Sequence, residues 1–242
     1  MSSYKNFSPF YDLFTYNVNY KKRTKYLLKL FERFDRKPTL MLDLACGTGS
    51  FSFEFAKKGI DVIGVDMSED MLCEASSKNN GDNKVLFLCQ KAQELELYGT
   101  VDGAICCLDS LNHITDYNDF KKSISNVSLF LEPQRLFIFD VNTLYKHKYV
   151  LGNNTFKIKR KGITCLWENS FCEKQNLTET NLTFFNKGNI SKQTITERAY
   201  SFKEIKEALD ESGLEILAVF GENTFKEPRK KTQRNVYITR KV

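Results

Sequence analysis

The segment from residue 40 to residue 49 constrains the fold of this chain more than any other. An apolar run that contains Asp43 leads into a turn with two glycines, Gly47 and Gly49, and then into a stretch with helical patterning. Glycines at such a turn let the backbone bend sharply and bring N–H groups against a ligand, while the following helix directs its positive end at the same place. This order predicts a nucleotide-type binding loop in a parallel α/β sheet.

A second acid follows one helix later. Residues 61–66 are predicted to form a strand that ends in Asp66, about 20 residues after the glycines, where a carboxylate can accept both ribose hydroxyls of an adenosine. Met67 comes next and is expected to pack on the adenine. Ser68 is a suitable N-cap for a helix that runs to about Lys78.

Two details separate this loop from a dinucleotide site. The dinucleotide fingerprint has a third glycine three positions after Gly49, where this chain has Ser52. In addition, the carboxylate of Asp43 would repel a pyrophosphate but suits a ligand with a cationic amino group. Asp43 and Asp66 together favour a zwitterionic adenosine ligand, and an NAD-dependent oxidoreductase is kept as an alternative.

The chain is long enough for one sizeable core, with 242 residues, of which 41% are hydrophobic and 20 are Phe. No run approaches the roughly 18 to 20 apolar residues that span a bilayer, and the N-terminus lacks the apolar part of a signal peptide. We therefore expect a cytoplasmic protein without membrane contact. Seven cysteines without a C-x-x-C pair indicate buried, reduced thiols, among them Cys46, Cys89, Cys106 and Cys107, and no metal site.

Further motifs follow in an order known from one enzyme family. The second acid is followed by a strand and the segment Gln90-Lys91-Ala92-Gln93-Glu94-Leu95, and then by a strand and loop at residues 101–113. This order resembles the class I S-adenosylmethionine (SAM)-dependent methyltransferases, most closely the small bacterial enzymes related to glycine and aminosugar N-methyltransferases. The resemblance implies SAM as cofactor and an N-terminal helical flap that closes on it. The cofactor-binding residues expected from the motifs and the resemblance are Tyr4, Tyr11, Asp43, Ala45, Gly47, Gly49, Asp66, Met67, Ala92, Gln93 and Leu108.

Three departures from the family pattern concern affinity and substrate. Relatives commonly have an acid for the adenine amino group where this chain has Lys91, so the adenine is expected to be read by backbone groups near Ala92 or by Gln93. Arg23 stands where many relatives have a tryptophan, and residues 133–135 replace the usual Pro-Gly-Gly. A SAM-binding protein without catalysis is therefore kept as an alternative.

The pattern predicts a Rossmann-like, doubly wound, mostly parallel seven-stranded sheet with an antiparallel β insertion in the C-terminal half. Residues 1–154 and 202–242 are assigned to the SAM-binding domain and residues 155–201 to the insertion. Because the insertion interrupts the α/β pattern after the fifth strand, it is expected at the carboxyl ends of the strands, covering the acceptor site. Helices are expected at 50–58, 119–131 and 203–212. The protein is expected to be a monomer or a homodimer.

Methyl transfer is an in-line displacement at carbon in which the sulfonium charge disperses, so positioning in a dry cavity supplies much of the catalysis. A general base is needed only when the acceptor must lose a proton. His113 and Tyr11 are the catalytic candidates, with a histidine packed at a helix start as the alternative for His113.

A small-molecule acceptor, methylated at nitrogen or oxygen, is the expected substrate. Trp167, Arg198 and Tyr200 are expected to line its site, with a place in the insertion's own core as the alternative for Trp167, and His147 is expected at the surface. The net charge of +6 raises the question of a nucleic-acid partner. Its basic residues gather at 157–161 and 226–231 with few aromatic residues between them, so solvated charge is favoured and an RNA or tRNA methyltransferase is kept as an alternative.

Overall fold

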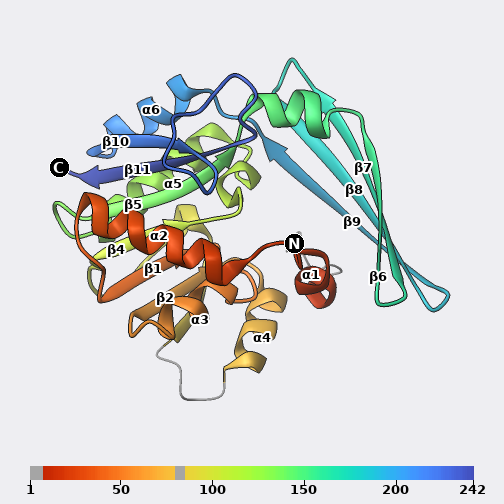
Figure 1. Ribbon diagram of the computed structural model, residues 1–242, viewed down its shortest axis with the longest axis horizontal. Coiled ribbons are helices and arrows are strands. Elements are labelled where there is room, and N and C mark those ends of the chain that lie inside the picture. Colours follow the sequence, from red (N-terminus) through yellow and green to blue (C-terminus); the bar gives the residue numbers. More distant parts are fainter. Residues whose placement is uncertain (1–7, 80–84) are drawn as a thin grey trace.

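A seven-stranded sheet forms the centre of the molecule (Figure 1). The computed structural model describes residues 8–79 and 85–242. The strand order is β10-β11-β5-β4-β1-β2-β3, and β11 runs against all the others, which confirms the predicted mostly parallel, Rossmann-like sheet. The strands are β1 Leu40–Leu44, β2 Asp61–Asp66, β3 Val85–Cys89, β4 Gly103–Cys106, β5 Leu136–Asn142, β10 Leu214–Gly221 and β11 Arg234–Lys241.

Helices cover both faces of this sheet because its strands alternate their side chains between two hydrophobic clusters. Leu42 and Leu44 of β1 belong to the cluster under α5 (Tyr117–Phe130) and α6 (Phe202–Glu211). Met41, which precedes Leu42, belongs to the cluster under α2 (Tyr20–Phe34) and α3 (Ser50–Ala56). All seven residues of β5 are buried, as expected of a strand that is covered on both sides.

Helix boundaries follow their capping residues. α4 (Glu69–Lys78) begins after Ser68, whose hydroxyl accepts a hydrogen bond from the first turn, as predicted. α5 begins two residues before the predicted start because Asp116 accepts hydrogen bonds from two backbone N–H groups there. α3 ends two residues before the predicted end because the chain turns at residues 57–59.

A second, four-stranded antiparallel sheet lies beside the first (Figure 1). Its strands are β6 Thr155–Arg160, β7 Ile163–Cys172, β8 Leu177–Asn186 and β9 Asn189–Arg198. We call the face that carries Cys165, Leu182, Phe184 and Ile195 its inner face, and these side chains form a small core. Two phenylalanines of α1 (Ser8–Phe14), Phe10 and Phe14, pack on the Phe184 ring at centroid distances of 5.2 and 5.5 Å. The second sheet is thereby joined to α1.

The strand β6 contains residues 157–160 of the basic run at 157–161. Its lysines alternate with Phe156, Ile158 and Arg160, and the Arg160 guanidinium lies 3.3 Å from the centroid of the Tyr16 ring. The two lysines therefore occupy one side of an edge strand, and Arg160 lies on the other side with the apolar residues.

His147 is buried, so its predicted surface position is wrong. It lies in a π-helical segment, η3 (Lys146–Leu151), that follows β5 and packs against β7 and β8. Its Nδ1 lies 2.8 Å from the Thr178 hydroxyl, and burial lowers the pKa of His147 to about 4. An unusual helix pitch, which hydrophobic periodicity does not reveal, turns this side chain inward.

Cys106 and Cys107 are buried free thiols, as predicted, whereas Cys46 is only partly buried and Cys89 is exposed at the end of the edge strand β3. Two short 3₁₀ turns complete the fold, η1 Ala92–Glu94 and η2 Ser110–His113. Within residues 8–79 and 85–242, no helix is long and apolar enough to span a bilayer, and no cluster of three or more His, Cys, Asp or Glu residues is suited to a metal.

The start of β1 depends on Asp102, which is 6% exposed. Its carboxylate accepts hydrogen bonds from the N–H groups of Thr39 and Leu40 at 2.9 and 2.8 Å and pairs with Arg36 at 3.1 Å. We expect Asp102→Ala to lower the free energy of unfolding by about 2–4 kcal/mol, because several donors lose a buried charged partner. Urea denaturation measures this change. Asp210→Ala, at an exposed pair on α6, should change it by less than about 0.5 kcal/mol, and similar values for both variants would contradict the assignment.

Candidate active site

The loop after β1 has the backbone that its glycines predict. Ala45, Gly47 and Gly49 all adopt positive φ, at 57°, 55° and 74°. A Cβ on Gly49 would lie 2.8 Å from the Phe87 ring, so only glycine fits there. The left-handed conformation of Ala45 is uncommon for a residue with a side chain and is the kind of local strain found at ligand sites.

Asp66 connects the ends of β1 and β2. One carboxylate oxygen accepts a hydrogen bond from the Gly47 N–H at 2.8 Å, and the other accepts one from the Ser68 N–H at 2.8 Å. Burial raises the pKa of Asp66, and these two bonds oppose that shift. Each oxygen keeps a lone pair for a ribose hydroxyl, and Met67 beside it is half exposed and available to a planar ring.

Asp43 lies deeper, with 2% of its surface exposed. The Ser52 hydroxyl, which stands in place of the third dinucleotide glycine, donates a hydrogen bond to Asp43 Oδ2 at 2.5 Å. Burial raises the pKa of Asp43 to about 7. A buried carboxyl at this position is stabilised by a cation, as expected of a site for an α-ammonium group.

The helix α1 closes over the glycine loop. The Thr48 hydroxyl donates to Asp12 Oδ1 at 2.7 Å, and Lys78 contacts both Asp12 and the Thr48 carbonyl. Tyr11 lines a cavity of about 20 Å³ together with Tyr20, Asp43, Ala45, Cys46, Gly47, Thr48, Ser50, Phe51, Cys107, Leu108 and Ser110. Burial raises the pKa of Tyr11 well above its usual value. Tyr4, the other expected flap tyrosine, lies outside the described residues.

The segment expected to face the adenine is the turn η1. The Ala92 carbonyl accepts a hydrogen bond from Asn126 at 3.3 Å, and Gln93 Nε2 lies 3.5 Å from Asp119. Lys91 is exposed and pairs with Glu94 at 3.0 Å. Both Ala92 and Gln93 are thus tied to α5, and Lys91 is directed away from the core.

The methyl loop, residues 107–113, is held by two charged side chains that the sequence analysis missed. Leu108 and Asp109 both have positive φ, and their N–H groups donate to the Asp140 carboxylate at 3.0 and 2.7 Å. Arg234, the first residue of β11, pairs with Asp109 at 2.6 Å and with Asp140 at 3.0 Å. A carboxylate inside the apolar strand 136–142 is the signal that points to Asp140.

A hydrogen-bond chain continues from Asp109 to the second sheet. Asn142 Nδ2 donates to Asp109 and, at 3.2 Å, to Glu197 Oε2. Glu197 lies two residues after Ile195 on β9 and so shares the inner face. His113 lies close enough to Asp66, Asp109 and Glu197 to act electrostatically on all three. The structure therefore gathers these groups at the carboxyl ends of β2, β4 and β5.

Two of the three residues expected to line the acceptor site are engaged elsewhere. Arg198 follows Glu197 and points to the opposite side, where it pairs with Glu204 at 2.8 Å. Tyr200 is 4% exposed and stacks on Phe120 at a centroid distance of 4.0 Å. Both side chains fasten the second sheet to the first. Trp167 lies on the inner face beside the small core, and its Nε1 donates to Asn169 at 2.8 Å.

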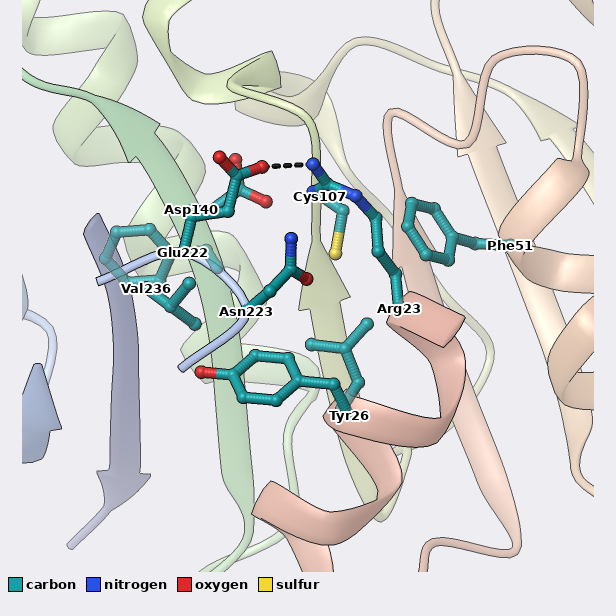
Figure 2. A pocket seen from close by; sticks show the side chains of 10 residues that line it. Arg23, Tyr26, Phe51, Cys107, Asp140, Glu222, Asn223 and Val236 are labelled. Atoms are coloured by element: carbon teal, nitrogen blue, oxygen red, sulfur yellow. Dashed lines mark hydrogen bonds and ion pairs between the residues drawn. The ribbon is translucent and has the colours of Figure 1, made fainter. Parts of the chain in front are cut away.

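Arg23, which departs from the family pattern, is also paired. Figure 2 shows its side chain extending from α2 to Glu222, with which it forms an ion pair. The cavity that these residues line with Tyr26, Cys107 and Asp140 measures about 10 Å³, which is at most enough for one water molecule. Arg23 therefore closes this side of the methyl loop.

Comparison with known proteins agrees with this geometry. A family model described as a methyltransferase domain matches residues 41–134. The protein YqeM of Bacillus subtilis (strain 168), which is provisionally named a methyltransferase, is 30% identical over 244 residues, and the match covers 98% of this chain and 97% of that protein.

Two solved structures extend the comparison. A SAM-dependent methyltransferase from Clostridium acetobutylicum ATCC 824 is 33% identical, with a TM-score of 0.86 and 98% of each chain covered. SAM-bound CalS10, an amino pentose methyltransferase from Micromonospora echinaspora, shares the fold at 16% identity, with a TM-score of 0.74 and coverage of 93% of this chain and 92% of that one. This chain belongs to the class I SAM-dependent methyltransferases, and SAM is its cofactor.

Proposed function

We propose that the enzyme methylates nitrogen or oxygen of a small molecule held between the methyl loop and the inner face of the second sheet. The observation that carries this proposal is enclosure: Tyr11 of α1 and Leu108 and Ser110 of the methyl loop line one cavity of about 20 Å³. A space of that size admits about one water molecule, so α1 has to move for ligands to enter. An enclosed site suits a small acceptor. The amino pentose named for the Micromonospora enzyme supports the proposal by analogy of fold.

The described residues fit the cofactor. Asp43 would hold the α-ammonium group, the left-handed loop would place its N–H groups against the methionine part, and Asp66 would accept the ribose hydroxyls. Ala92 and Gln93 would border the adenine. When bound, SAM supplies a methyl group activated by a sulfonium. Tyr11 and Leu108 enclose that region and exclude water, and His113 is the group in the methyl loop that can take a proton from the acceptor.

The cofactor assignment predicts how two variants behave. Gly47→Val should abolish SAM binding, because a β-branched residue is strained at a φ of 55° and its side chain would occupy the approach to the loop. Asp66→Ala should weaken SAM binding by about 1–3 kcal/mol through loss of charged hydrogen bonds. Calorimetric titration with SAM measures both effects, and Glu69→Ala in the exposed first turn of α4 serves as the control. Unaltered affinity in both loop variants would overturn this site.

The carboxyl of Asp43 makes cofactor binding depend on pH. With a pKa of about 7 it is half protonated near neutrality, and only its ionised form attracts an ammonium group. The affinity for S-adenosylhomocysteine (SAH) should therefore fall below about pH 7, by up to about tenfold per unit, and level off at higher pH. Titration calorimetry from pH 5.5 to 8.5 tests this, together with Asp43→Asn, which should bind more weakly and show a flatter profile. A flat profile in the unaltered protein would refute the role of Asp43.

The acceptor class can be tested with labelled SAM. We expect methyl transfer to small amines or hydroxyl compounds in a panel that contains glycine, glucosamine, glucose and a catechol, and no transfer to bulk transfer RNA. Transfer to RNA with no transfer to any small molecule would reverse the proposal. SAH formation measured by chromatography in the same reactions distinguishes true turnover from nonspecific labelling.

A further inference from the structure

Glu197 is a buried carboxylate that no described lysine or arginine contacts directly. Its side chain is 11% exposed at the end of β9. In the part of the chain that the structure describes, no lysine or arginine nitrogen lies within 4 Å of it, and its nearest basic group is His147 Nε2 at 3.8 Å. Because the pKa of His147 falls to about 4, this ring is neutral near pH 7 and does not balance the carboxylate.

Two buried acids near Glu197, Asp109 and Asp140, are paired with a cation. Arg234 pairs with both Asp109 and Asp140, and the Arg234 charge holds the pKa of Asp109 below its usual range despite burial. Lys146 donates to Asn142 Oδ1 at 2.9 Å, and it is Asn142 that bonds to Glu197. Burial raises the pKa of Glu197, although His113 and Lys146 attract its charge and oppose that shift. Glu197 is thus the acid of this hydrogen-bond chain that has no directly paired cation within residues 8–79 and 85–242.

A second observation marks the same place. Nε2 of His147 is fully buried and has no hydrogen-bond partner among the described residues, although Nδ1 is paired with Thr178. Buried polar atoms of native proteins are nearly always paired, so an unpaired one next to this carboxylate indicates a missing polar group.

Glu197 also lies close to the reacting centre. Asn142 Nδ2 bonds to Glu197 and to Asp109, and Asp109 follows Leu108, which lines the cofactor cavity. The carboxylate is therefore separated from the methyl loop by one amide group.

We propose that Glu197 binds the cationic amino group of the acceptor, which makes this enzyme an N-methyltransferase. The inference rests on the proposed small-molecule function and narrows it from nitrogen or oxygen to an amine. A buried carboxylate with this surrounding attracts an ammonium group and gains little from a neutral hydroxyl.

The same carboxylate can prepare the nitrogen for attack. The acceptor ammonium gives one proton to Glu197, which frees the nitrogen lone pair. That pair forms the new C–N bond while the C–S bond breaks and its electrons return to sulfur. The sulfonium charge is lost and the methylated nitrogen becomes cationic, so charge is conserved, and the proton on Glu197 passes to solvent after release.

Sinefungin provides a test that does not require the natural acceptor. This SAM analogue carries a protonated amine where SAM carries its methyl group, whereas SAH has neither. We expect the unaltered protein to bind sinefungin more tightly than SAH, and Glu197→Gln to reduce this preference about tenfold or more with little change in SAH affinity. Glu179→Gln, the same substitution on the exposed opposite face of the sheet, should leave the preference unchanged.

The outcomes separate the two proposals. If SAH fails to bind the unaltered protein, the cofactor site itself is wrong. If SAH binds and the sinefungin preference is the same in Glu197→Gln as in Glu179→Gln, the role of Glu197 is refuted. With glucosamine and glucose as paired probes in the labelled-SAM assay, transfer to the hydroxyl compound alone would also contradict an amine acceptor. Thermal denaturation of each variant confirms that it is folded.

Discussion

The ion-pair bridge of Arg234 to Asp109 and Asp140 is the interaction on which the rest of the site depends. Arg234 is the first residue of β11, and because β11 runs against its neighbours, its first residue lies at the edge where the parallel strands end. The bridge fixes the methyl loop in a conformation with two successive positive φ angles, which its side chains alone do not favour. The single antiparallel strand of the sheet thus supplies the cation that makes the methyl loop rigid.

Much of the framework could be predicted because it rests on local patterns. The glycine loop, the acid at the end of β2 and the Ser68 cap follow from backbone rules that act over a few residues. The acceptor side could not be predicted in the same way. Arg198 and Tyr200 were expected to line the acceptor site, but strand alternation directs Glu197 inward and Arg198 outward. Because neighbouring residues of a strand point to opposite faces, an error of one position places Arg198 where Glu197 lies.

The departures from the family pattern have local explanations away from the cofactor. Gln134 has a φ of 64°, a left-handed conformation where relatives use glycine, and its N–H donates to the Lys241 carbonyl at 2.8 Å. Arg135 pairs with Asp35 of the α2 C-terminus at 3.1 Å. The Gln134 hydrogen bond and the Arg135 ion pair thus hold this turn in place without the two glycines that relatives have there. The turn lies at the start of β5, at the opposite end of the sheet from the methyl loop.

The double attachment of α1 couples the glycine loop to the second sheet. Its polar side bonds to Thr48 in the glycine loop, while its phenylalanines pack on Phe184 of the second sheet. Because this seven-residue helix has both attachments, a movement of α1 away from the glycine loop also disturbs its packing on the second sheet. The position of α1 therefore depends on both the glycine loop and the second sheet, and a shift of either one disturbs the contacts that the other makes with this helix.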